Sequence, residues 1–154
     1  MTTDTSEKGL ETLIVADMVA ASWVQGKPTD YDREYAVDLE QLSTFLEKTQ
    51  EEVAGSLDLH EDSPTRRKFL ARLQGEITKR GVIDVLRKGV KHGQHHIELF
   101  YGTPTPGNTK AEHLYAENRF SITRQLRYSR DEMKRALDLG IFINGLPVST
   151  FELK

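Results

Sequence analysis

The chain has 154 residues, of which 37% are apolar and 29% charged, with a formal net charge of −3 and no cysteine. This length and composition fit one globular domain that buries a core. The absence of cysteine excludes disulfides, thiolate zinc sites and a cysteine nucleophile. No apolar run is long enough to span a membrane, and the polar N-terminus MTTDTSEKGLE is not a signal peptide, so we expect a cytoplasmic protein.

Charge is distributed unevenly along the chain. Residues 1–62 carry 15 acidic and 4 basic side chains, a balance of −11. Residues 66–91 carry nine basic and two acidic side chains (+7), and residues 119–135 carry six and two (+4). The negative total argues against a nucleic-acid binder, but such asymmetry can create a local positive field. Two interpretations stay open, a polyanion-binding surface and ordinary solvated faces.

The first half of the chain has helical periodicity. Apolar spacing predicts a helix over residues 6–22 and a second, weakly amphipathic one over residues 38–54. Ser63 and Pro64 fit the N-cap and first position of a third helix, which Gly81 would end before a further short helix. The N-terminal part of the protein is therefore predicted to be helical.

The second half changes to the period of a strand. Alternating apolar residues predict a strand over residues 97–101, and a short helix follows over residues 109–118. The segment RFSITRQLRY alternates, with Phe120, Ile122, Leu126 and Tyr128 expected on one face, which Arg124 interrupts, and a polar, cationic face opposite. Helices first, then three or four strands with an inserted helix, predict an α/β domain with α+β-like order.

The C-terminal segment LDLGIFINGLPVSTFELK predicts two strands joined at Asn144-Gly145. Because side chains alternate across a strand, Glu152 and Lys154 lie on one face. A two-residue turn would place Asp138 on the opposite face from Glu152. A three-residue or bulged loop would place both carboxylates on the same face, so a site at this hairpin requires such a loop.

Two carboxylates and an amine on one face would suit phosphodiester hydrolysis. Asp138 and Glu152 would share a hard cation such as Mg²⁺, which prefers oxygen ligands and lowers the pKa of a bound water. Lys154 would orient that water or offset phosphate charge. The spacing alone is a weak signal, because charged side chains on a strand are commonly just solvated.

Four blocks carry a family resemblance: YDREYAVD (31–38), ITKRGVIDVLRKGVK (77–91), LYAENRFSITRQLRYS (114–129) and LDLGIFINGLPVSTFELK (137–154). In this order and spacing they resemble the N-terminal part of the restriction (R) subunit of type I restriction-modification enzymes. The resemblance implies an endonuclease domain of the PD-(D/E)xK fold, with a mixed β-sheet flanked by helices.

The resemblance also implies roles for particular residues. Asp138 and Glu152 would bind Mg²⁺, and Lys154 would be the catalytic lysine. Glu11 matches a helix carboxylate that related folds place near the metal, although its place at the edge of an apolar stripe also allows plain solvation. The proline of the fold's name is Leu137 in this chain. The strand residues Arg119, Gln125 and Arg127 would face DNA phosphates or solvent.

The family resemblance implies further domains that this chain does not contain. Its members continue into ATP-driven motor domains, whereas this chain has no Gly-rich phosphate loop followed by Lys and Ser or Thr. We therefore expect residues 1–154 to be a C-terminally truncated endonuclease domain, with ATP used only by the full-length parent. The parent would work with methyltransferase and specificity subunits to cleave unmodified foreign double-stranded DNA, in defence against phage.

Two rival interpretations remain. One is a nuclease of the same fold that acts alone. The other is an inactive remnant that retains only a DNA- or partner-binding surface, which an opposite-face hairpin register would favour. The histidines of KHGQHH, His92, His95 and His96, are interpreted as loop residues rather than zinc ligands, because no cysteine or suitable helical spacing accompanies them.

Overall fold

The computed structural model describes residues 6–127 and 136–153. The elements, in chain order, are α1 (Glu7–Ala20), β1 (Val24–Gln25), the 3-10 helix η1 (Pro28–Asp30), β2 (Tyr31–Asp32), β3 (Val37–Asp38), α2 (Leu39–Thr49), α3 (Glu51–Leu57), α4 (Pro64–Arg80), α5 (Val82–Lys88), β4 (Val90–His92), β5 (His95–Ile97), α6 (Thr109–Ala116), β6 (Phe120–Arg127), β7 (Ala136–Ile143) and β8 (Leu146–Phe151). Within the described residues, no helix is long and apolar enough to cross a membrane.

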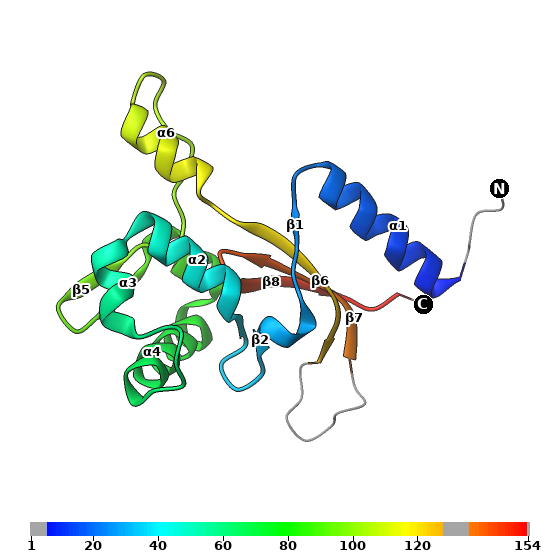
Figure 1. Cartoon of the computed structure of the whole chain (residues 1–154), viewed down its shortest axis with the longest axis horizontal. Helices are drawn as coiled ribbons and strands as arrows, with labels where there is room; N and C mark the ends of the chain where they lie inside the picture. Colours follow the sequence, from blue (N-terminus) through cyan, green and yellow to red (C-terminus); the bar gives the residue numbers. More distant parts are fainter. Residues whose placement is uncertain (1–5, 128–135, 154) are drawn as a thin grey trace.

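A four-stranded mixed sheet forms the centre of the molecule, in the order β1-β6-β7-β8. β1 runs parallel to β6, and the β6–β7 and β7–β8 pairs are antiparallel. The sheet lies between α1 and the group of helices α2 to α4 (Figure 1). The predicted class, a mixed α/β domain with a sheet flanked by helices, is confirmed.

The helix boundaries follow local capping chemistry. Ser6 caps α1, its hydroxyl accepting from the Gly9 N–H at 3.1 Å. Ser63 caps α4 in the same way, and Gly81 ends it at φ 86°, both as predicted. The segment predicted as one helix over residues 38–54 is two helices, because Gln50 leaves the helical conformation at φ −146°. Its side-chain amide instead exchanges two hydrogen bonds with the backbone of Glu98.

The strand predicted over residues 97–101 is only partly correct. β5 ends at Ile97, and the segment that follows bonds to side chains instead of to a neighbouring strand. Asn144 donates to the carbonyl of Leu99 at 2.8 Å, and Asn118 bonds both backbone groups of Tyr101. These side-chain amides satisfy the backbone as a ladder would, without any strand geometry.

Two clusters of buried apolar side chains hold the layers together. The larger cluster joins α2 to α5 with the end of the hairpin, and its fully buried members include Leu42, Phe45, Phe69 and Leu146. The smaller one fixes α1 to the sheet and comprises Val15, Ile122 and Leu139, with Ile14, Met18, Ile141 and Leu153 packed against it. The smaller cluster positions α1 over β6 and β7, where the site described below lies.

The β7–β8 hairpin differs from the predicted loop. Its turn contains two residues, Asn144 (φ 51°) and Gly145 (φ 83°), and Ile143 pairs with Leu146. Positive φ at both positions is the geometry that Asn-Gly turns favour. A Cβ on Gly145 would come within 2.6 Å of the Asp38 carbonyl oxygen. Glycine is therefore required where the turn docks on the start of α2.

Candidate functional site

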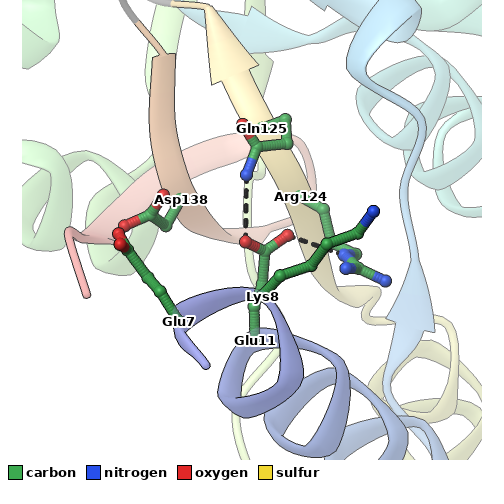
Figure 2. Close-up of a pocket in the computed structure, with 6 residues that line it drawn as sticks. All are labelled: Glu7, Lys8, Glu11, Arg124, Gln125 and Asp138. Atoms are coloured by element: carbon green, nitrogen blue, oxygen red, sulfur yellow. Dashed lines mark hydrogen bonds and ion pairs between the residues drawn. The ribbon is translucent and has the colours of Figure 1, made fainter. Parts of the chain in front are cut away.

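A pocket of about 410 Å³ lies between α1 and strands β6 and β7. Its lining is charged or polar throughout and consists of Glu7, Lys8, Glu11, Arg124, Gln125 and Asp138. Figure 2 shows the three α1 residues facing the three strand residues across this space. The pocket thus brings together Asp138, Glu11 and Gln125, three of the residues that the sequence singled out.

A bulge in β8 changes the register of the hairpin. After the two-residue turn, Phe142 pairs with Pro147, but Ile141 pairs with Ser149. The extra residue shifts the later pairs, so that Leu139 pairs with Phe151, the last residue of β8. This is the register in which Asp138 and Glu152 would pair if the strand continued. Glu152 lies beyond the last pair, so its convergence with Asp138 stays a prediction.

Asp138 is held in place at one carboxylate oxygen. Its Oδ2 accepts a hydrogen bond of 2.5 Å from the backbone N–H of Leu153, just past the end of β8. Figure 2 shows the carboxylate of Glu7 pointing toward Asp138. Glu152 is exposed, and Lys154 lies outside the described residues. Asp138 is thus anchored by the same segment that carries the other two residues of the expected catalytic set.

Glu11 is the most buried charged group of the pocket, with a residue exposure of 2%. Its Oε1 accepts from Arg124 Nε at 2.7 Å, and its Oε2 accepts from Gln125 Nε2 at 2.9 Å. Arg124 also donates from Nη2 to the hydroxyl of Thr12 at 3.1 Å. Glu11 is therefore not plainly solvated. Its expected role at a metal stays a prediction, since both of its oxygens already have partners.

An irregularity in β6 explains why Arg124 and Gln125 reach the same carboxylate. Gln125 has a φ of 52°, in the left-handed region that non-glycine residues rarely adopt. Consecutive strand residues normally point to opposite faces, and this conformation breaks that alternation. Leu126 consequently lies near Gly140 and Phe142, on the sheet face away from α1. The prediction that Leu126 shares a face with Ile122 was wrong for this reason.

The first half of the polar face predicted for β6 is buried. Ser121 and Thr123 are both 0% exposed. Their hydroxyls and Asp38 Oδ2 have no hydrogen-bond partner within the described part of the chain. Burial raises the pKa of Asp38 to about 6.

The structure describes the side chains of two of the three predicted DNA-contact residues, Arg119 and Gln125. Arg119 Nε donates to the side-chain carbonyl of Gln41 at 2.7 Å, so Arg119 is tied to α2. The side chain of Arg127 lies outside the described residues. Gln125 is exposed at the pocket but bonded to Glu11. The DNA-binding role of all three stays a prediction.

Much of the basic charge on α4 and α5 is already paired. Arg80 bonds Glu76 at 3.0 Å and Asp84 at 2.7 Å, and Lys88 also contacts Asp84. Arg67 forms a two-pronged bond to Asp62. Pairing of this kind lowers the field that a count of basic residues suggests.

The histidines of KHGQHH were predicted to be loop residues, but they lie in strands β4 and β5. His92 and His95 pair across the β4–β5 hairpin. The ring of His92 packs against Phe69 with 5.6 Å between ring centroids, and burial lowers the pKa of His92. Within the described residues, no three His, Cys, Asp or Glu side chains group as metal ligands.

Three pocket residues were missed by sequence reasoning: Glu7, Lys8 and Arg124. Glu7 and Lys8 precede Glu11 by one helical turn, so the i, i+3 and i, i+4 spacing on α1 was available as a signal. Arg124 was treated as an interruption of an apolar face. Its position is explained by the ion pair with the buried carboxylate of Glu11, which lies 113 positions away in the sequence.

The fold and the pocket together indicate a class of protein. A mixed sheet flanked by helices, with carboxylates and cations in a pocket beside the hairpin, is consistent with a nuclease-like fold. Residues 4–154, essentially the whole chain, match the family described as type I restriction enzyme R protein N terminus. The chain belongs to this family. No curated protein and no solved structure gives a match.

Proposed function

We propose that this chain is the Mg²⁺-dependent DNA endonuclease domain of a type I restriction enzyme R subunit. Its substrate is unmodified foreign double-stranded DNA, cleaved within an ATP-dependent complex that includes methyltransferase and specificity subunits. The observation that carries the proposal is the position of Asp138, which lines the pocket under α1 together with Glu11 and accepts a hydrogen bond from the backbone of Leu153, the residue after Glu152. Family membership over residues 4–154 supports the same function.

The carboxylates suit Mg²⁺ by their chemistry. Mg²⁺ is commonly bound through one or two carboxylates and keeps several of its waters. Asp138 Oδ2 accepts from Leu153, and its second oxygen has no hydrogen-bond partner among the described residues. Glu152 is exposed and follows Phe151, which pairs with the neighbour of Asp138, Leu139. We propose that these two residues hold the ion, which when bound would activate a water for attack on phosphorus.

Cationic side chains of the chain would then bind and orient the substrate. Lys8 and Arg124 line the pocket from opposite sides, so either can contact a phosphodiester lying between α1 and the sheet. Lys154 follows Glu152 by two positions and would offset charge on the phosphate as it is attacked. Electrostatic stabilisation and positioning are the main protein contributions expected for such a reaction.

Of the two rival interpretations, the inactive remnant would be favoured by a register that puts Asp138 and Glu152 on opposite faces of the hairpin. The last pair past the bulge, Leu139 with Phe151, instead has the register that favours the nuclease. A nuclease that acts alone differs from the proposed one in its dependence on other subunits, and the assay can separate the two.

The test is cleavage of supercoiled plasmid in the presence of Mg²⁺. We expect cutting by the chain assembled with its methyltransferase and specificity partners and ATP, and a rate lower by on the order of a hundred-fold or more for Asp138→Asn. Asp17→Asn, an exposed carboxylate on α1 outside the pocket, is the control and should cut normally.

Three outcomes of this assay would contradict the proposal or change it. Equal cleavage by Asp138→Asn and the unsubstituted chain would contradict the assigned site. No cleavage by the folded, assembled protein would contradict the function. Full cleavage without partners or ATP would favour the stand-alone nuclease.

A further inference from the structure

The guanidinium of Arg124 is fixed by two groups on α1. Its Nε donates to Glu11 Oε1 at 2.7 Å, and its Nη2 donates to the hydroxyl of Thr12 at 3.1 Å. The other Glu11 oxygen accepts from Gln125, and Figure 2 draws both bonds of this carboxylate. The Glu11 side chain is 3% exposed, whereas that of Arg124 is 27% exposed. The carboxylate is therefore enclosed, while Arg124 still lines the pocket.

We propose that Glu11 is a positioning residue that fixes Arg124 as a phosphate-binding cation of the pocket. In this assignment Glu11 acts on the guanidinium and not on a metal ion, and the ligand of Arg124 is a phosphodiester of the DNA backbone. The inference rests on the proposed nuclease function and deepens it, because it names the residues that hold the phosphate-binding group in place.

Arg124 keeps donors free for a phosphate. A guanidinium carries five N–H groups in a planar fork and matches two phosphate oxygens with parallel bonds. Nη1 has no hydrogen-bond partner within the described residues, and Nη2 uses one of its two N–H groups on Thr12. Lys8 lines the same pocket from α1 and adds a second cation. The pocket thus offers a phosphate one forked donor and one point charge.

Fixation in advance strengthens binding by such a side chain. A long arginine loses rotamer freedom when it is immobilised on a ligand, and this loss opposes binding. Arg124 is already held by Glu11 and Thr12, so most of that loss is not repeated when a phosphate binds. The planar fork also needs a fixed orientation to make two parallel bonds. Glu11 therefore contributes to DNA binding without contacting DNA.

The surroundings of Glu11 fit this role better than that of a metal ligand. Both of its oxygens already accept hydrogen bonds, one from a cation and one from an amide. A buried carboxylate is stable when it is paired and hydrogen-bonded in this way, whereas loss of its cation leaves an uncompensated charge. In the part of the chain that the structure describes, Glu11 does not group with two other potential metal ligands. Its contacts are those of a residue that holds Arg124.

The backbone of β6 supports the same arrangement. Gln125 has a φ of 52°, which a non-glycine residue adopts only at a cost in free energy. Such strain persists where surrounding contacts determine it. Here it brings the side chains of Arg124 and Gln125 to one carboxylate, although consecutive strand residues normally point to opposite faces. The strained backbone therefore completes the bonds that hold Glu11 and, through it, Arg124.

The positioning role predicts an effect opposite in sign to that of simple charge. As a bare negative charge beside the pocket, Glu11 would repel a phosphate, and its removal would tighten DNA binding. If Glu11 instead holds Arg124 in place, its removal weakens DNA binding although a negative charge is lost. A metal ligand would leave DNA binding unchanged when no metal is present. The direction of one change in affinity therefore separates the three roles.

The experiment measures DNA affinity by fluorescence anisotropy with a labelled duplex in EDTA, so that neither metal binding nor cleavage contributes. Glu11→Met has a similar length but no acceptor, and we expect about tenfold weaker binding. Glu11→Gln keeps an oxygen that can accept from Arg124 Nε, so its affinity should stay within about twofold of the unsubstituted chain. Asp17→Met removes an exposed α1 carboxylate outside the pocket, and this matched control should not weaken binding.

A double-mutant cycle distinguishes positioning from general damage to the fold. Arg124→Gln removes a phosphate contact, so it should lower the slope of log affinity against log salt by about one. If Glu11 acts through Arg124, Glu11→Met should cause no further weakening in the Arg124→Gln background. Damage to the fold would add to the effect of Arg124→Gln, and circular dichroism would detect it.

A second variant keeps the test available if Glu11→Met does not fold. Thr12 is exposed, and Thr12→Val removes only the second bond that fixes the guanidinium. It should weaken DNA binding about two- to threefold, and unchanged binding would contradict the role of fixation.

The outcomes for this inference differ from those for the proposed function. Tighter or unchanged DNA binding by folded Glu11→Met would overturn the positioning role, as would additive effects in the cycle. If neither Arg124→Gln nor Lys8→Gln weakened DNA binding, the pocket would not be the DNA site and the proposed function would be contradicted. Weakening by both of these variants, with no effect of Glu11→Met, would remove the positioning role alone.

Discussion

Single residues in this protein are placed by contacts with distant parts of the chain. Asp138 accepts a hydrogen bond from Leu153, and Glu11 bonds two residues of β6. Each carboxylate is thus fixed by an element other than its own. Such support from neighbouring groups is what holds a site within the narrow tolerances that catalysis requires.

The buried carboxyl of Asp38 predicts that the stability of the fold depends on pH. It is 1% exposed, it caps α2 through Oδ1, and burial raises its pKa to about 6. A carboxyl whose pKa is higher in the folded state stabilises the fold most below its unfolded pKa, and that contribution is lost as pH rises through about 6. Ionisation of Asp38 should therefore cost on the order of 3 kcal/mol near neutral pH.

We expect Asp38→Asn to remove this loss of stability. Asparagine caps a helix as well as aspartate does, so the bond to the Gln41 N–H is kept while the buried charge disappears. Urea unfolding at about pH 4 and about pH 8 should show a higher free energy of unfolding for Asp38→Asn at the higher pH only. A variant that is less stable than the unsubstituted protein at about pH 8 would contradict this account.

At the scale of elements, the β7–β8 hairpin determines whether the site can form. Its turn docks against α2, with the Asp38 N–H donating to the Gly145 carbonyl at 2.8 Å. The bulge that follows sets the register of β8 relative to Asp138. A change at the turn should therefore affect both stability and the site.

Gly145→Ala tests the docking of the turn. The new Cβ would lie 2.6 Å from the Asp38 oxygen and 2.7 Å from the Leu42 Cβ, at a φ of 83°. Crowding and the left-handed backbone together should lower the free energy of unfolding by about 3 kcal/mol or more. Gly55→Ala on α3, where nothing lies within 4 Å, should instead raise it by about 0.5–1 kcal/mol. Equal stability of the two variants in urea denaturation would argue against a tightly docked turn.

For the whole molecule, the distribution of charge predicts where DNA binds. The pocket under α1 contains Lys8, whereas α4, which lies on the other side of the sheet (Figure 1), includes the exposed Lys79. Each lost phosphate contact lowers the slope of log affinity against log salt by about one. We expect this change for Lys8→Gln and none for Lys79→Gln, measured by fluorescence anisotropy with a labelled duplex. The reverse result would place the DNA on the α4–α5 surface.

Much of the fold was predictable because it depends on local signals. Capping at Ser63, the stop at Gly81 and the strand β6 follow from residue types at fixed spacing. The break at Gln50 was not predictable, since it depends on a partner in residues that are distant in sequence. The same limit explains β5, which ends where side-chain amides replace a strand partner.

The candidate site was predictable in part for a similar reason. Asp138 and Glu152 were singled out by alternation within one hairpin and by the family resemblance, although the bulge within β8 that changes the register was not anticipated. The role of Arg124 could not be predicted, because it depends on the left-handed backbone of Gln125 and on a contact with Glu11 of α1, at the other end of the chain. Family membership supports the function, and the geometry supplies the residues to test.

The most direct test of the central claim is to locate the metal. Crystals of the protein with a phosphorothioate duplex and Mn²⁺ would reveal the ion through its anomalous scattering. The account predicts a Mn²⁺ peak in the pocket under α1, within bonding distance of the Asp138 carboxylate and beside Glu152. Mn²⁺ peaks elsewhere in the crystal, with none in contact with Asp138, would contradict the assignment of this pocket as the nuclease centre.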